Sequence, residues 1–116
     1  MVIGTTLGPR SQLTKAVRRA EKRMCDIVSL KLGHRVTPLS YGSIDVDPGL
    51  LVIWIRVRND EEKEQLTVDE TLRESLRQEL LEEGYPEEAA LRAFIGFESQ
   101  ETVDRDSSGD WWGHFR

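Results

Sequence analysis

The sequence predicts an α+β fold in a single domain, with a mostly antiparallel four-stranded sheet and the helices on one face. Three observations lead to this prediction. The chain has 116 residues, which suits one domain. Apolar residues recur at helical spacing in two long segments and alternate with polar ones in four shorter segments. The predicted order is helix, strand, strand, helix, strand, strand, without the regular strand–helix–strand alternation that is typical of parallel sheets.

Residues 11–32 form the first predicted helix. Ser11 suits the N-cap, and Gly33 suits the position just beyond the last turn. Residues 1–10 contain two glycines and a proline and are predicted to be a flexible N-terminal arm, so the domain itself covers 11–116. The apolar stripe of the helix consists of Leu13, Ala16, Val17, Ala20, Met24, Ile27 and Val28.

The next two segments are predicted to form a β-hairpin. Residues 36–46 and 50–58 alternate in polarity, and Asp47-Pro48-Gly49 between them has the composition of a tight turn. A glycine at position 42 indicates a bulge in the first of these strands.

The second half of the chain begins with a predicted helix over residues 68–83, which ends at Gly84. A third strand is expected around Ile95, residues 99–107 suit either a helix or a strand, and residues 111–115 alternate like a last strand. In that last strand Trp112 would point to solvent, because the more apolar side holds Trp111 and Phe115. The predicted core contains Val17, Ala20, Met24, Ile27, Ile53, Ile55, Leu72, Leu76 and Ile95.

Several function classes lose support from the sequence. The longest apolar run, residues 50–55, is far shorter than the roughly 20 residues of a membrane helix, and no signal peptide is recognisable, so we expect a cytoplasmic protein without membrane contact. Cys25 is the only cysteine, which excludes an internal disulfide. No common catalytic, nucleotide or metal motif occurs, so we predict no catalytic residue, metal or cofactor, although an enzyme without a recognisable motif stays an alternative.

Charge is distributed unevenly along the chain. The net charge is -5, yet residues 1–36 hold eight basic and two acidic residues, whereas residues 37–116 hold eight basic and nineteen acidic residues. Such polarity bears on partners and not on fold.

Two surfaces follow from this charge pattern as candidates for partner binding. An acidic helix face, together with an exposed tryptophan in the C-terminal segment, suits a protein with a basic surface; the residues are Glu70, Glu74, Glu79, Glu82 and Trp112. The polar side of the first helix offers the alternative, a contact with nucleic-acid phosphates. An acidic protein partner or this protein's own acidic helix fits the same face. Its residues are Lys15, Arg18, Arg19, Lys22 and Arg23.

The last 20 residues, from Phe97 to Arg116, resemble a segment of known proteins. The segment ending in Ser-Gly-Asp-Trp-Trp-Gly-His-Phe-Arg resembles the closing segment of small uncharacterised bacterial α+β proteins, some of which are thought to be immunity proteins against toxins. The resemblance implies a binding protein and assigns no catalytic residue. The leading expectation is therefore a small protein-binding module of the toxin-neutralising kind.

Overall fold

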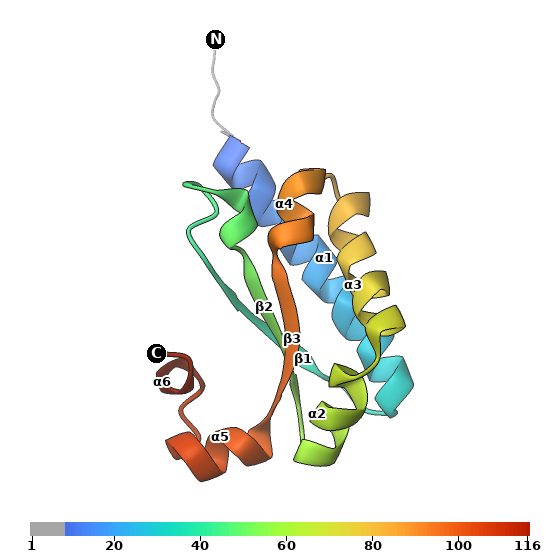
Figure 1. The fold of residues 1–116 in the computed structure, drawn as a ribbon, viewed down its shortest axis with the longest axis vertical. Coiled ribbons are helices and arrows are strands. Elements are labelled where there is room, and N and C mark those ends of the chain that lie inside the picture. The colour runs from blue at the N-terminus through green and yellow to red at the C-terminus, as the bar shows by residue number, and fades with distance from the viewer. Residues whose placement is uncertain (1–8) are drawn as a thin grey trace.

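The computed structural model describes residues 9–116, which form one α+β domain (Figure 1). The predicted arm at 1–10 lies outside the described residues except for its last two positions, which already belong to the first helix. The helices are α1 (Pro9–Leu32), α2 (Asp60–Thr67), α3 (Glu70–Glu82), α4 (Glu87–Arg92), α5 (Gln100–Ser107) and α6 (Trp111–His114), and a short 3-10 helix, η1, covers Pro48–Leu50. The strands are β1 (Thr37–Tyr41), β2 (Val52–Val57) and β3 (Phe94–Ser99).

The predicted four-stranded, mostly antiparallel sheet is wrong. The sheet has three strands in the order β1-β2-β3, and it is mixed. β1 pairs antiparallel with β2, with Leu39 opposite Trp54, but β3 runs parallel to β2, with Ile95 opposite Ile53. The reason is the connection between β2 and β3. Helices α2, α3 and α4 return the chain to the beginning of β2, so β3 starts beside it and runs in the same direction.

The predicted last strand is also wrong, because residues 111–114 form helix α6. The Asp110 side chain accepts a hydrogen bond from the Gly113 N–H and so caps this turn. Residues 100–107 are helical as well, and the Ser99 side chain accepts from the Thr102 N–H at the start of α5. Short segments of four to eight residues carry too little periodicity to separate a helix from a strand.

The core lies between one face of the sheet and the layer formed by α1 and α3. Eight of the nine predicted core residues belong to this buried cluster, and Ile27 packs against it while partly exposed. Ile53, Ile55 and Val57 of β2 point into it, and Ile95 and Phe97 of β3 lie beside them. No helix among the residues described here is long and apolar enough to cross a membrane.

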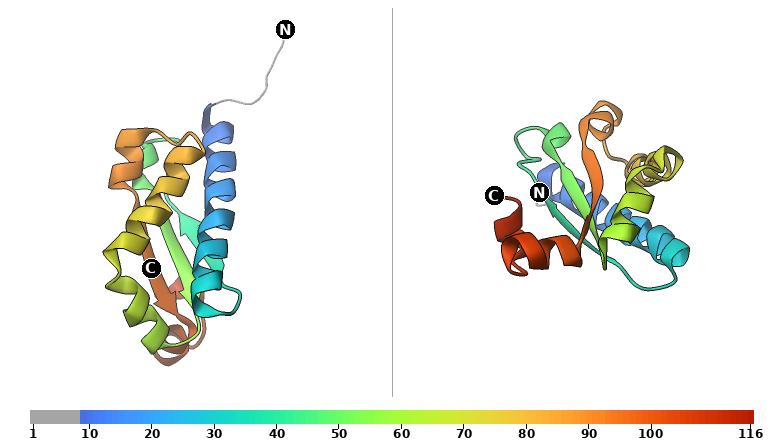
Figure 2. Two further views of the ribbon diagram at one scale, coloured as in Figure 1. Left: turned by 90° about the vertical axis from the view of Figure 1, so that its right-hand side faces the viewer. Right: turned by 60° about the horizontal axis from the view of Figure 1, so that its bottom comes forward.

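The opposite face of the sheet is partly covered by the C-terminal segment. The prediction of helices on one face only is therefore wrong, since α6 packs against β2 from the second side (Figure 2). The contact is between Phe115, just after α6, and Trp54, whose side chain points away from the core because it alternates with Ile53 and Ile55.

Candidate docking surface

Aromatic side chains from all three strands share the second face of the sheet. Tyr41 of β1 and Phe94 of β3 are both opposite Val52, so they flank β2 in one row across the sheet. Trp54 follows in the next row, between Leu39 and Gly96. The strand register therefore brings three rings together that lie far apart in the sequence.

The C-terminal segment extends this group into a continuous row of rings. Phe94 packs against Trp54 with ring centroids 4.8 Å apart, and Trp54 stacks on Phe115 at 4.7 Å with an interplanar angle of 14°. Phe115 lies 6.1 Å from Tyr41, which lies 6.5 Å from Trp112. We call these five residues the aromatic surface.

Much of the aromatic surface is open to solvent. Trp112 is 57% exposed, Phe94 46% and Tyr41 37%. A few large apolar side chains on a surface are ordinary, but a contiguous group of exposed rings is a candidate contact surface.

Gly96 makes the row of rings possible. A Cβ atom at this position would lie 2.6 Å from the Phe94 ring and 3.2 Å from the Trp54 ring. The absence of a side chain at Gly96 leaves the space that these two rings occupy. Beside them, the Arg56 guanidinium lies 5.5 Å from the centre of the Trp111 ring, in cation–π contact.

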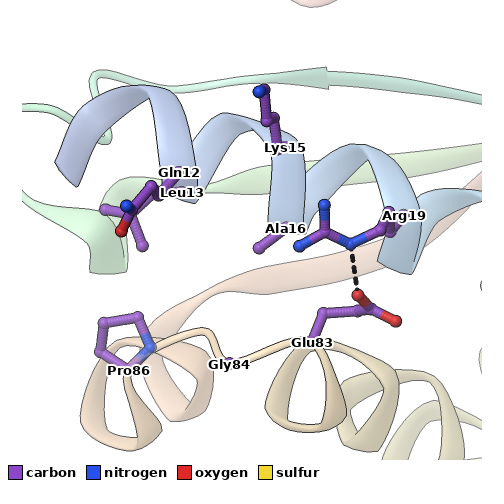
Figure 3. A pocket seen from close by; sticks show the side chains of 8 residues that line it. All are labelled: Gln12, Leu13, Lys15, Ala16, Arg19, Glu83, Gly84 and Pro86. Atoms are coloured by element: carbon purple, nitrogen blue, oxygen red, sulfur yellow. Dashed lines mark hydrogen bonds and ion pairs between the residues drawn. The ribbon is translucent and has the colours of Figure 1, made fainter. Parts of the chain in front are cut away.

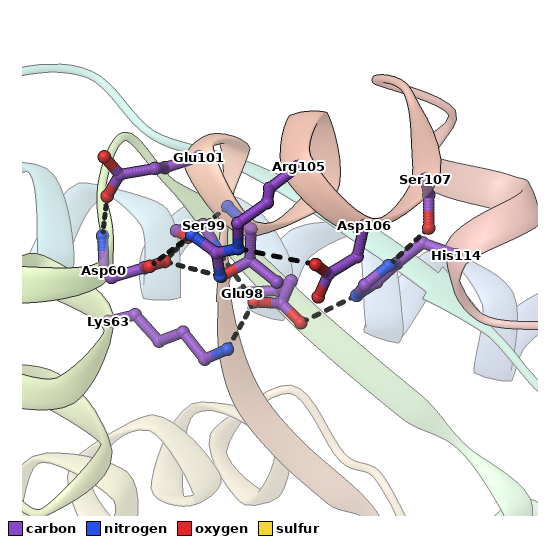
Figure 4. A network of polar contacts seen from close by, with 10 residues as sticks. Asp60, Lys63, Glu98, Ser99, Glu101, Arg105, Asp106, Ser107 and His114 are labelled. Carbon is purple, nitrogen blue, oxygen red and sulfur yellow. Dashed lines mark hydrogen bonds and ion pairs between the residues drawn. The ribbon is translucent and has the colours of Figure 1, made fainter.

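A chain of polar contacts connects α6 to β3 (Figure 4). His114 Nε2 lies 2.9 Å from Glu98 Oε2, its Nδ1 lies 2.8 Å from Ser107 Oγ, and Lys63 Nζ lies 2.7 Å from Glu98 Oε1. Burial raises the pKa of the Glu98 carboxyl, but hydrogen bonds from Lys63, the Ser99 N–H and His114 together lower it below its usual value. Glu98 is therefore a buried anion with three donors around it.

The serine–histidine–glutamate sequence of contacts has the order of a catalytic triad, but its surroundings do not suit acyl transfer. The backbone N–H groups that follow Ser107 all donate within the turn: those of Ser108 and Gly109 to the Val103 carbonyl, and that of Asp110 to the Ser107 carbonyl. The three N–H groups that directly follow Ser107 are therefore not available to bind a developing oxyanion. These contacts position the C-terminal segment.

A second cluster joins α2 to α5. The Asp60 carboxylate accepts hydrogen bonds from the hydroxyls of Ser99 and Thr102 and from the Arg105 guanidinium, and the Asp60 N–H donates to Glu101 (Figure 4). The Ser99 and Thr102 hydrogen bonds, with that of Arg105, lower the pKa of Asp60 to about 2. The start of α5 is thereby held against the start of α2.

The two charged helix faces that the sequence singles out partly pair with each other. Arg19 Nε lies 2.6 Å from Glu83, across a groove between α1 and the turn after α3 (Figure 3), and Arg23 Nε lies 2.6 Å from Glu79. Glu79 is only 9% exposed, so it is largely withdrawn from a partner. Glu70, Glu74 and Glu82 on α3, and Lys15, Arg18 and Lys22 on α1, are exposed.

Trp112 is exposed, as predicted, but the predicted reason is wrong. Its side chain reaches solvent from helix α6 and not from one face of a strand. Trp111 and Phe115, predicted as a buried pair, are only half-buried and lie outside the core. They are four residues apart in a helical turn and contact each other, with ring centroids at 6.1 Å. Sequence reasoning missed Tyr41 and Phe94 as functional candidates, since only the register reveals that they flank Trp54.

Other kinds of site find little support in the described part of the chain. No group of three or more His, Cys, Asp or Glu residues between 9 and 116 is arranged to hold a metal ion. Cys25 is buried, and this burial raises the pKa of its thiol to about 11, which makes it unreactive at neutral pH. No protein-family model, curated protein or solved structure matches the chain.

Proposed function

We propose that this protein is a binding module that docks a partner protein on its aromatic surface. The observation that carries the proposal is the continuous row of five rings, three of which are more than one-third exposed. Tryptophan and tyrosine dominate the binding energy of protein interfaces, because they bury a large area with few rotatable bonds.

The rigidity of this surface supports the proposal. Trp54 and Phe94 project from strands, and Trp54 Nε1 donates to the Tyr41 hydroxyl at 3.2 Å. The His114–Glu98 contact fixes α6 and with it Trp112. Side chains that are ordered before binding lose little entropy on association, so each contact adds more to affinity.

The exposed part of the acidic α3 face supports a second form of the same function. Glu70, Glu74 and Glu82 face solvent and suit a partner with a basic surface, as a toxin-neutralising immunity protein in the cytoplasm would need. Binding of nucleic acid by the α1 cations has less support, because Arg19 and Arg23 form ion pairs with Glu83 and Glu79.

The test is affinity capture from the cells that express the gene, followed by purification of the captured protein and titration against variants. Trp112→Ala should weaken binding by more than about 1 kcal/mol and leave the unfolding midpoint nearly unchanged. Leu30→Ala is the matched control, because Leu30 is 86% exposed on α1, away from the aromatic surface.

Equal affinities of wild type and the Trp112 variant would contradict docking on the aromatic surface. If a Glu70→Lys and Glu74→Lys double variant then loses binding instead, the acidic α3 face is the contact. Capture of nucleic acid whose affinity falls steeply as the salt concentration rises would support binding by the α1 cations instead.

A further inference from the structure

A polar pocket of about 340 Å³ lies at the end of the sheet where β1 begins and β2 ends, beside the starts of α5 and α6 (Figure 1). This volume suits a small ligand, since pockets for small molecules begin at roughly 300 Å³. Three of the side chains that line it belong to arginine, and none is acidic. The lining includes His34, Arg35, Arg56, Arg58, Gln100 and Trp111.

The three arginines reach this pocket from two segments of the chain. Arg56 lies near the end of β2 and Arg58 directly follows that strand, so alternation places both on the second face of the sheet. Arg35 lies in the connection between α1 and β1, two residues before Thr37, which is opposite Arg56 in the antiparallel register. The register therefore brings Arg35 to the same end of the sheet.

Arg56 is held in place but forms no ion pair with a described residue. Its guanidinium lies 5.5 Å from the centre of the Trp111 ring, and its Nη2 donates to the Pro38 carbonyl at 3.1 Å. Its Nε is buried and has no acceptor among the described residues. The carboxylate opposite it on β3 belongs to Glu98, which is already paired with Lys63 at 2.7 Å. Arg56 therefore keeps its positive charge beside the pocket.

Arg35 and Arg58 are well exposed and can both turn toward an anion in the pocket. Arg58 lies 3.6 Å from the Glu62 carboxylate, which is also bonded to His34 at 2.6 Å. Arg35 pairs at 2.8 Å with the exposed carboxylate of Asp26. Ion pairs of exposed arginines contribute little to stability, so a bound anion can gain contacts from both guanidinium groups.

We propose that this pocket binds the phosphate group of a small soluble ligand. Guanidinium groups are always charged in proteins and bind phosphate through two parallel hydrogen bonds, and a phosphate group has enough oxygens for several of them. Trp111 Nε1 donates to Gln100 Oε1 at 3.0 Å, which fixes an indole in the wall of the pocket for the rest of the ligand. This inference goes beyond the proposed function, because neither Arg56 nor Trp111 belongs to the aromatic surface.

A nucleic acid fits the pocket less well than a small ligand. Successive phosphates of a strand need an extended positive surface. Carboxylates adjoin this pocket instead, since Asp26 and Glu62 contact its lining residues and Glu101 follows Gln100. The net charge of the chain is -5. These charges repel further phosphates, so the pocket suits a ligand with a single phosphate group.

The experiment is an NMR titration of the full chain at constant ionic strength with inorganic phosphate, glycerol phosphate and adenosine monophosphate. Binding should shift the Trp111 indole signal and the amides of residues 34–37 until they saturate, and leave the Trp54 indole signal unchanged. Glycerol and adenosine, which lack the phosphate, should shift none of these signals. A tighter fit of one of the two esters identifies an ester as the ligand, whereas equal affinities identify free phosphate.

Variants test the role of the arginines. Arg56→Gln should weaken binding of the tightest probe by roughly tenfold or more, because charge-assisted hydrogen bonds are lost. Arg58→Gln should weaken it by roughly threefold or more. Arg18→Gln, at an exposed arginine of α1 that does not line the pocket, is the matched control and should change it less than about twofold. If the unfolding midpoint shows that the Arg56 variant is not folded, Arg58→Gln decides, since it alters only an exposed side chain.

Three results overturn the inference. If no probe shifts the Trp111 signal at millimolar concentration, the pocket does not bind phosphate. Equal weakening by Arg18→Gln and Arg58→Gln would reveal diffuse attraction to basic residues and no site. A single-stranded oligonucleotide that binds this pocket more tightly than adenosine monophosphate would make it a nucleic-acid interface. Trp112→Ala should leave phosphate binding unchanged, so the capture experiment tests the proposed function independently.

Discussion

At the residue scale, the lack of a side chain at Gly96 leaves room for the Phe94 and Trp54 rings of the aromatic surface. A Cβ here would meet the far edge of the Phe94 ring, and Phe94 is 46% exposed, so the ring can swing outward. We therefore expect Gly96→Ala to separate Phe94 from Trp54 while lowering the free energy of unfolding by less than about 1 kcal/mol. Near-ultraviolet circular dichroism should lose intensity from the coupled rings. An unchanged spectrum would mean that the two rings do not depend on Gly96.

Leu76 belongs to the core on the face of the sheet that α1 and α3 cover. Its side chain on α3 is fully buried in the cluster that joins α1 and α3 to β2 and β3. Leu76→Ala should lower the free energy of unfolding by about 2–5 kcal/mol, because the substitution removes buried methyl groups and leaves a cavity. Urea titration measures the loss. Val68→Ala, at a 78% exposed position in the turn before α3, serves as the control and should cost far less. A loss near zero for Leu76→Ala would show that α3 is not packed on the sheet.

At the scale of elements, the Asp60 cluster joins α2 to α5 and should make stability depend on pH. The pKa of Asp60 is lowered from 3.8 to about 2, chiefly by the hydrogen bonds from Ser99 and Thr102. A lowered pKa in the folded state favours folding while the carboxylate is charged. This contribution is complete above pH 4 and is lost as pH falls from about 4 to about 2.

Asp60→Asn should therefore lower the melting temperature at pH 6, and the difference from wild type should shrink as pH falls from 4 to 2. Thermal unfolding followed by circular dichroism at a series of pH values measures it. Glu64→Gln, an exposed carboxylate on the same helix, is the control and should show no such convergence. A difference between wild type and Asp60→Asn that stays constant down to pH 2 would contradict the stabilising role of the charged carboxylate.

At the scale of the whole molecule, the two faces of the sheet contribute unequally to the stability of the fold. The core cluster contains no residue after Phe97, and α6 has no buried residue. A chain shortened to end at residue 107 should therefore keep a cooperative unfolding transition. It would lose the Phe115–Trp54 stacking and the His114–Glu98 contact, and ring pairs of this kind contribute roughly 0.5–1.5 kcal/mol each.

The same truncation should uncover Trp54 and Leu39, because they lie on the second face of the sheet with the C-terminal segment. We expect a red shift of tryptophan emission and stronger binding of a dye that fluoresces on apolar surfaces. Loss of the cooperative transition would show instead that the C-terminal segment is part of the folding core.

The sequence by itself determined the two long helices and the core. The stripe of α1 and the line of leucines on α3 repeat over many turns, and the glycines at 33 and 84 have the positive φ angles expected just beyond the ends of helices. The turn at Asp47 and the pairing of β1 with β2 are local, so composition indicated them as well. Long periodic segments and short connections contain this information within a few residues.

Tertiary structure alone decided the direction of β3 and the aromatic surface, and it contributed to the helical state of α6. Alternation tells which side chains share a face of a strand, but it is the same for a parallel and an antiparallel neighbour. A segment as short as α6 takes its conformation from its cap at Asp110 and from its contact with the sheet. The aromatic surface needs Tyr41, Trp54 and Phe94 side by side, and their proximity is set by strand register, which depends on contacts between residues far apart in the chain.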